Sequence, residues 1–115
     1  MSNFKNLLVW QKADELAFQV YRITRNFPRE EMYGLTSQVR RAAVSVCSNL
    51  AEGSGRQHRN ETRQFSNIAL GSLAEVESLL GFSRRLNFVE KEEYEFLDML
   101  RKEVSALLWR FYKNL

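Results

Sequence analysis

The stretch of sequence that decides the fold is residues 35–53, which read LTSQVRRAAVSVCSNLAEG. From residue 35 to residue 51 the only charged side chains are those of Arg40 and Arg41. Apolar residues recur here at steps of three and four, which places them on one face of an α-helix. They are Leu35, Val39, Ala42, Ala43, Val46 and Leu50. We therefore predict an amphipathic helix that turns this face toward a core.

The opposite side of the same helix lacks the lysines and glutamates of an ordinary solvent-exposed surface. It carries small or apolar residues instead, namely Ser37, Val44, Ser48 and Ala51. In a small protein, a helix that is buried on two sides is either wrapped by its own neighbours or used as a subunit contact. We expect this second side to form a subunit interface.

Outside this stretch the sequence shows three further helical patterns, and no alternation typical of strands. We predict helices over about residues 7–26, 36–53, 60–86 and 90–113. Pro28 ends the first helix, because the residue before a proline avoids the α region. Gly53 and Gly55 suit the end of the second helix and Asn87 ends the third. Short connections between amphipathic helices predict an all-α fold, a single-domain antiparallel up-down-up-down four-helix bundle.

The third predicted helix has an apolar face and a back of small residues. We expect the following residues to face inward: Phe65, Ile68, Ala69, Ser72, Val76, Leu79 and Leu80. Gly71 and Gly81 each cost about 1 kcal/mol relative to alanine in a helix interior, so we expect another backbone to lie close to them. Together with the second side of helix 36–53, the predicted subunit interface comprises Phe18, Ser37, Val44, Ser48, Ala51, Gly71 and Ala74.

Composition restricts the class of protein. With 115 residues, 44% of them hydrophobic and 27% charged, the chain suits one globular domain. The N-terminal segment lacks the apolar core of a secretion signal, and no apolar run approaches the ~20 residues of a membrane span. The lone cysteine, Cys47, allows no internal disulfide. We expect a cytoplasmic protein without a membrane partner.

A basic loop is our preferred nucleic-acid site. The net charge of +3 permits an acidic partner, and Arg56, His58, Arg59 and Arg63 lie on or just after a glycine-bearing loop from which side chains can reach outward. The alternative is a solvated loop without a ligand. Alternating helix directions place this loop at the same end of the bundle as Arg110 and Lys113.

Arg40 and Arg41 are a second candidate for phosphate contacts, since paired guanidinium groups can bind phosphate in bidentate fashion. The alternative is a structural role, in which at least one of them pairs with a carboxylate such as Glu75 or Glu52 across the bundle or the subunit interface. Four aromatic residues away from the centres of the apolar stripes could stack on unpaired bases, but we favour interface roles for them. They are Trp10, Phe18, Tyr21 and Trp109.

The sequence does not favour an enzyme. His58 is the only histidine and Cys47 the only cysteine, so one subunit cannot supply the ligands of a zinc site. Cys47 lies inside a predicted helix and His58 beyond its end, which disfavours a nucleophile pair. No glycine loop of the kind that cradles phosphates is present. We predict no catalytic residue, no metal, no cofactor and no small-molecule substrate.

Several segments resemble the 23S rRNA intervening-sequence protein family of small bacterial four-helix proteins. They are LLVWQKADELAFQVY, FPREEMYGL, QVRRAAVSVCSNLAEGSGR and FSNIALGSLAEVESLL, and the resemblance covers nearly the whole chain. It implies a homopentamer, a barrel of five bundles with a basic surface. It also implies kinship with proteins that accompany diversity-generating retroelements and bind nucleic acid there.

Two functions follow as hypotheses. The first is a homo-oligomeric scaffold, pentameric by the resemblance, that binds RNA or DNA through backbone phosphates. The second is a protein-interaction adaptor whose ring presents a docking face for a protein partner, without direct nucleic-acid binding.

Overall fold

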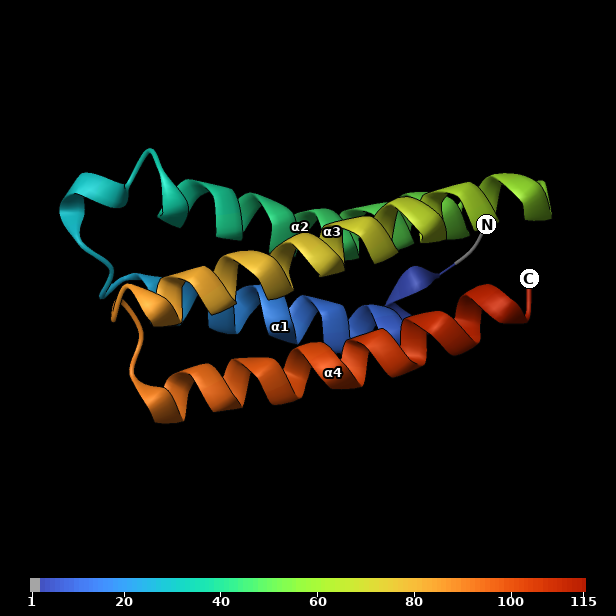
Figure 1. Ribbon diagram of the computed structural model, residues 1–115. Coiled ribbons are helices and arrows are strands. Elements are labelled where there is room, and N and C mark those ends of the chain that lie inside the picture. Colours follow the sequence, from blue (N-terminus) through green and yellow to red (C-terminus); the bar gives the residue numbers. More distant parts are fainter. Residues whose placement is uncertain (1–2) are drawn as a thin grey trace.

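The computed structural model describes residues 3–115, which form four α-helices and two short 3₁₀ turns (Figure 1). The elements are η1 Phe4–Asn6, α1 Leu8–Thr24, η2 Arg29–Glu31, α2 Leu35–Ser54, α3 Arg59–Arg85 and α4 Lys91–Lys113. All four helices begin and end within two residues of the predicted limits. The described residues contain no strand, and the all-α four-helix bundle is confirmed.

The helices run up and down in an elongated bundle of 43 × 24 × 20 Å (Figure 1). Each helix packs against the one before and the one after it, and α4 returns to α1 and closes the arrangement. Among the described residues, helices on the diagonals do not approach one another closely. The closest pair is α2 and α3, where the hydroxyl groups of Ser45 and Ser72 lie 2.8 Å apart in a hydrogen bond.

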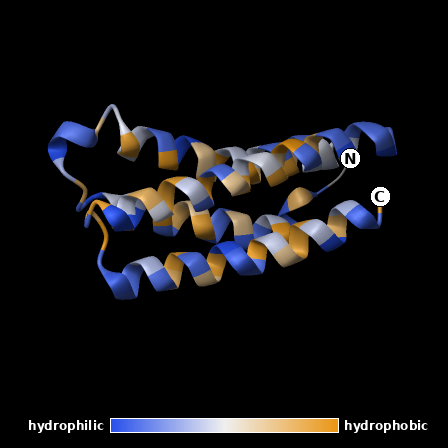
Figure 2. Cartoon of the chain, viewed as in Figure 1, coloured by the Kyte–Doolittle hydropathy of each residue, from blue (hydrophilic) through white to orange (hydrophobic). Residues whose placement is uncertain are grey.

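One hydrophobic core runs along the bundle and receives the predicted face of α2. Every residue of that face is buried: Leu35, Val39, Ala42, Ala43, Val46 and Leu50. The same core contains Leu16 of α1 and Leu97 of α4, both with no exposed surface. Hydrophilic residues gather at the ends of the bundle, most plainly where α2 passes into α3 (Figure 2). The amphipathic interpretation of α2 is therefore confirmed for its inner face.

Two expectations for α3 are wrong within this chain. Ile68 is 51% exposed rather than inward-facing, whereas Ala69 and Ser72 are buried and Ser72 forms a hydrogen bond with Ser45 of α2. Gly71 and Gly81 approach no other backbone, since a Cβ built on either would meet nothing within 4 Å. The close approach occurs at Gly53 instead, and it fixes the position of the loop that follows α2.

A local hydrogen bond and a local backbone conformation define two of the helix ends. The carboxylate of Glu31 in η2 accepts a hydrogen bond from the N–H of Leu35 at 3.1 Å, which satisfies one of the free donors at the start of α2. Asn87 follows α3 with a φ of 63°, the left-handed conformation common just after a helix. The predicted end of α3 at Asn87 thus has a clear conformational basis.

Candidate nucleic-acid interface and subunit interface

The basic loop predicted to bind nucleic acid connects α2 to α3 at one end of the bundle (Figure 1). A Cβ built on Gly53 would lie 2.7 Å from the Cβ of Phe65, so only glycine allows this approach of the two helices. The hydroxyl of Thr62 donates a hydrogen bond to the carbonyl oxygen of Gly53 at 2.8 Å. The loop is therefore anchored to both helices, and its side chains project from a fixed base.

Arg56 is held by contacts on both sides of this loop. Its Nη2 lies 3.0 Å from Oε2 of Glu52, and its guanidinium lies 4.9 Å from the centre of the Phe65 ring. Both members of the ion pair are substantially exposed, and an exposed pair of this kind contributes little to stability. The guanidinium can therefore exchange its carboxylate partner for a phosphate at little cost.

Arg63 reaches from α3 toward the end of α4. Its Nη2 donates a hydrogen bond to the main-chain oxygen of Leu115, and its guanidinium lies 5.9 Å from the centre of the Tyr112 ring. His58 and Arg59 are exposed, and within residues 3–115 neither forms a side-chain hydrogen bond or an ion pair. The structure thus leaves most of the predicted basic group available to a ligand.

Two cations of α4 extend this surface. Arg110 and Lys113 are exposed in the last turns of α4, and neither forms an ion pair in the described part of the chain. They lie at the same end of the bundle as the α2–α3 loop (Figure 1). We call Arg56, His58, Arg59, Arg63, Arg110 and Lys113 the basic end.

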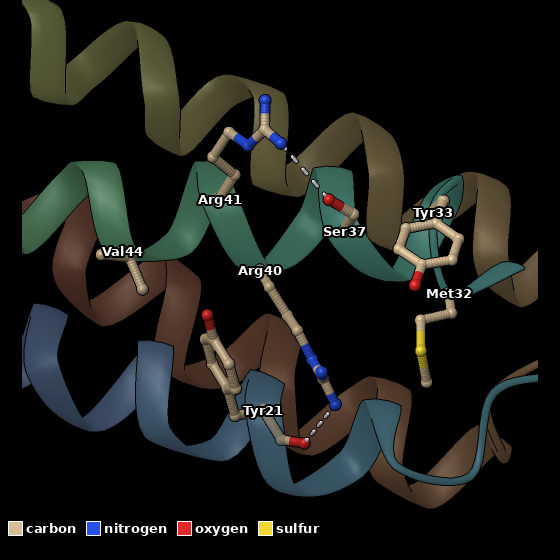
Figure 3. A pocket seen from close by; sticks show the side chains of 7 residues that line it. All are labelled: Tyr21, Met32, Tyr33, Ser37, Arg40, Arg41 and Val44. Carbon is tan, nitrogen blue, oxygen red and sulfur yellow. Dashed lines mark hydrogen bonds between the residues drawn. The ribbon is translucent and has the colours of Figure 1, made fainter.

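Arg40 and Arg41 leave α2 in different directions (Figure 3). The Nε of Arg40 donates a hydrogen bond to the hydroxyl of Thr24 at 2.8 Å, and its Nη2 donates to the carbonyl oxygen of Tyr21 at 3.3 Å. Its guanidinium also lies 4.6 Å from the centre of the Tyr21 ring. Arg41 is exposed, and its contact with the hydroxyl of Ser37 is long, at 3.5 Å. Arg40 therefore joins α2 to α1, whereas Arg41 is free to meet a ligand.

Within one subunit, the carboxylate partners considered for these arginines are not found. Glu52 pairs with Arg56, and within residues 3–115 neither Arg40 nor Arg41 forms an ion pair. The physical reason is direction: Arg40 turns toward α1, while Glu75 belongs to α3 on the other flank of α2. Since its partners are neutral, Arg40 keeps an uncompensated positive charge. The proposed contact of this pair with phosphate stays a prediction.

A groove of about 360 Å³ lies beside these arginines, between α1 and the first half of α2. Its lining residues are Tyr21, Met32, Tyr33, Ser37, Arg40, Arg41 and Val44 (Figure 3). Met32 is 52% exposed and Tyr33 95% exposed, although both side chains are large and mainly apolar. They lie in the turn between η2 and α2, where helical periodicity gives no signal, so they were not predicted. Such a patch is typical of a contact surface.

The predicted subunit interface also lies at the surface of the chain. Phe18 is 63% exposed and Val44 is 39% exposed. The remaining residues are exposed or half-buried: Ser37, Ser48, Ala51, Gly71 and Ala74. Ile68, which was expected to face inward, lies one turn before Gly71 and adds apolar area on the exposed side of α3. These residues are available to a second subunit, and the interface itself stays a prediction.

The only cysteine and the only histidine of the sequence lie in different environments in the structure. Cys47 is buried within α2, and burial, together with the negative charge of Asp14, raises the pKa of its thiol. His58 precedes the first residue of α3 and is exposed. Within residues 3–115 no three His, Cys, Asp or Glu side chains cluster closely enough to hold a metal ion. In the same range, no helix has the length and apolar character needed to cross a membrane.

Comparisons with known proteins agree with this architecture. The model of the 23S rRNA-intervening sequence protein family matches residues 5–110. The chain is also similar to a crystal structure from Bacteroides thetaiotaomicron, described as a protein of unknown function from the S23 ribosomal protein family. The two are 25% identical with a TM-score of 0.85, and the match covers 92% of this chain and 96% of that chain. The comparison with curated proteins gave no match.

Proposed function

Because the chain belongs to the 23S rRNA-intervening sequence protein family, we propose that it is a non-enzymatic, homo-oligomeric protein that binds RNA or DNA through backbone phosphates. The basic end provides the main contact surface. The family name and the description of the solved relative both refer to ribosomal components, which supports RNA as the first ligand to test. A cytoplasmic location belongs to the same proposal.

The observation that carries the proposal is the excess of positive charge at the basic end, where, within residues 3–115, only Arg56 pairs with a side-chain carboxylate. In the described part of the chain, Arg59, Arg110 and Lys113 form no ion pair with a side-chain carboxylate. Elsewhere among the described residues, three lysines pair with carboxylates, as Lys12 does with Glu103 at 3.5 Å. Unpaired cations in one region attract a polyanion, and phosphate contacts release the counterions of the nucleic acid.

Several copies of the basic end in one oligomer would bind a polyanion more tightly than a single copy. The exposed outer side of α2 and the groove lined by Tyr33 and Val44 supply an apolar surface on which a second subunit can pack. A closed ring presents several copies of the basic end to one polyanion, which raises overall affinity without any new contact. The resemblance described above implies five subunits, and we propose a homopentamer on that basis.

Fluorescence anisotropy with a labelled structured RNA and a labelled DNA single strand tests the proposal. We expect binding at low salt, with an affinity that falls linearly with salt on logarithmic axes. The triple variant R56E/R59E/R63E should bind at least about tenfold more weakly than a control of equal net charge. The matched control is R22E/R25E/R85E, which reverses three exposed arginines near the opposite end of the bundle.

Two results would contradict nucleic-acid binding through the basic end. One is no binding of either probe at low salt, and the other is equal affinity of the two triple variants. A protein partner that stays bound after nuclease treatment and at high salt would instead support the adaptor function. Circular dichroism of both variants checks that the helices remain folded.

A further inference from the structure

Two aromatic rings are stacked at the surface of the basic end. The rings of Trp109 and Tyr112, one turn apart on α4, have centroids 5.6 Å apart and planes inclined by only 10°. Trp109 is 51% exposed, whereas Tyr112 is half-buried and has the guanidinium of Arg63 5.9 Å from its ring centre. Tyr112 and Arg63 thus form a support, and Trp109 presents the more accessible ring.

The surroundings of Trp109 are polar and positively charged. A shallow pocket of about 420 Å³ is lined by Ala106, Trp109, Arg110, Lys113 and Asn114, without a carboxylate side chain. On the other side of Tyr112 lies a second pocket of about 380 Å³. Its lining residues are Asn60, Arg63, Gln64, Asn67 and Tyr112, so it is rich in amide groups. The aromatic pair therefore lies between cations and hydrogen-bonding side chains.

We propose that Trp109 is a stacking platform for an unpaired nucleobase, so that the basic end prefers single-stranded RNA or DNA. Arg110 and Lys113 then neutralise the adjoining phosphates, and Asn114 has an amide with which to bond a base edge. This inference rests on the proposed function and names the class of nucleic acid that the site takes. It also replaces the interface role first expected for Trp109.

Charge favours a nucleic acid over a second copy of this chain at Trp109. A two-fold contact through this surface would bring Arg110 and Lys113 of one copy against the same cations of the other, and the ring contacts proposed above use residues of α1, α2 and α3 instead. Desolvating cations without acidic partners is costly. A single-stranded polyanion supplies a flat apolar face for the indole and negative charge for the two cations together.

The experiment uses the W10F variant, in which Trp109 is the only remaining tryptophan. Three probes are titrated at equal phosphate concentration: an oligo(dT) single strand, a DNA duplex, and inorganic polyphosphate, which has no bases. We expect oligo(dT) to quench the fluorescence of Trp109, because a base stacks on the indole, and polyphosphate to leave it unchanged. Adding W109A should weaken oligo(dT) binding about tenfold and alter polyphosphate binding less than about twofold, and W109F should restore part of the loss.

Each contrary outcome has its own meaning. Binding of all three probes without quenching, or with an equal effect of W109A on each, would overturn stacking and leave phosphate binding in place. No binding of any probe to the unsubstituted protein would overturn both proposals. A change in oligomeric mass on W109A, measured by light scattering, would show that Trp109 is a subunit contact and so would also overturn the inference.

Discussion

Gly53 and Phe65 touch across the α2–α3 contact so closely that any side chain at residue 53 would collide with the aromatic residue. The conflict is at the Cβ of Phe65, 2.7 Å from a Cβ built on Gly53, and not at the movable end of a side chain. The preceding turn of α3 adds the hydrogen bond from the hydroxyl of Thr62 to the carbonyl oxygen of Gly53. This contact ties the basic loop to the bundle.

We expect G53A to destabilise the protein by about 1–3 kcal/mol, although alanine is the better helix former. The collision can be relieved only by moving α3 away from α2, since the Cβ of Phe65 is fixed by its backbone. Urea unfolding followed by circular dichroism measures the free energy of unfolding. The same shift of α3 should also loosen the loop that carries Arg56.

G81A is the matched control for this variant. A Cβ at residue 81 would meet nothing within 4 Å, so only helix propensity changes. We expect a gain of about 0.5–1 kcal/mol in the free energy of unfolding. Equal effects of the two variants would mean that the α2–α3 contact is looser than the structure describes.

Periodicity was enough to predict the inner face of α2. Every predicted core residue of that helix is buried, because an apolar stripe on a helix must be covered by something. Ile68 shows where periodicity fails: its spacing suits the core, but it is exposed, while the neighbouring Ala69 is buried and Ser72 meets Ser45 of α2. The spacing of residues along the sequence shows which of them share a helix face, but it does not show how closely two helices pack.

The position of the candidate nucleic-acid site was predictable from the sequence, but most of its side-chain contacts were not. The loop carrying Arg56 and Arg63 follows from the glycines and basic residues of one short segment. The contact of Arg63 with Leu115, 52 residues away, depends on how α3 and α4 pack. Helix packing also decides the partners of Arg40, which donates hydrogen bonds to a hydroxyl and a carbonyl oxygen and not to a carboxylate.

The adjacent arginines of α2 should differ in their effects on stability. We expect R40A to cost about 1–2 kcal/mol, because it removes the hydrogen bond to the buried Thr24 and the cation–π contact with Tyr21. R41A should stay within about 0.5 kcal/mol of the unsubstituted protein, since Arg41 is exposed. Urea unfolding of both variants makes the comparison.

RNA titrations of R41A then test the remaining role of Arg41. If it contacts a phosphate, the variant should bind more weakly and its salt slope should fall by about one unit. An unchanged slope would remove Arg41 from the set of nucleic-acid contacts.

Asp98 should make stability depend on pH. Burial by itself would raise the pKa of its carboxyl, but the hydrogen bond and charge of Arg101, assisted by Lys102, lower it below the ordinary value. The Nε of Arg101 donates to Oδ1 of Asp98 at 2.9 Å. Since the folded state has the lower pKa, ionised Asp98 stabilises the fold above its unfolded pKa. This contribution is lost as the pH falls through the lowered pKa.

We therefore expect D98N to lose about 1–2 kcal/mol at pH 7 and to approach the unsubstituted protein as the pH falls through the lowered pKa of Asp98. Urea unfolding at a series of pH values measures the difference. The control is E95Q, which removes the exposed Lys91–Glu95 pair with its 4.0 Å separation and should cost less than about 0.5 kcal/mol. A deficit in D98N that is the same at every pH would contradict the assigned role of the Asp98 charge.

Val44 gives the sharpest test of the outer side of α2 as a subunit interface. It is 39% exposed and lines the groove beside Tyr21, so a lysine there is harmless to a monomer. In an assembly the same lysine would be buried without a carboxylate partner, which is strongly destabilising. We expect V44K to dissociate the oligomer toward the 13.5 kDa monomer while the helices remain.

The control M99K makes a similar change at a residue of α4 that is 58% exposed and should leave the assembly intact. Size-exclusion chromatography with light scattering gives the masses, and circular dichroism the helix content. A monomeric mass for the unsubstituted protein at micromolar concentration would remove the interface, whereas lost helicity in V44K would mean that Val44 supports the core of its own subunit.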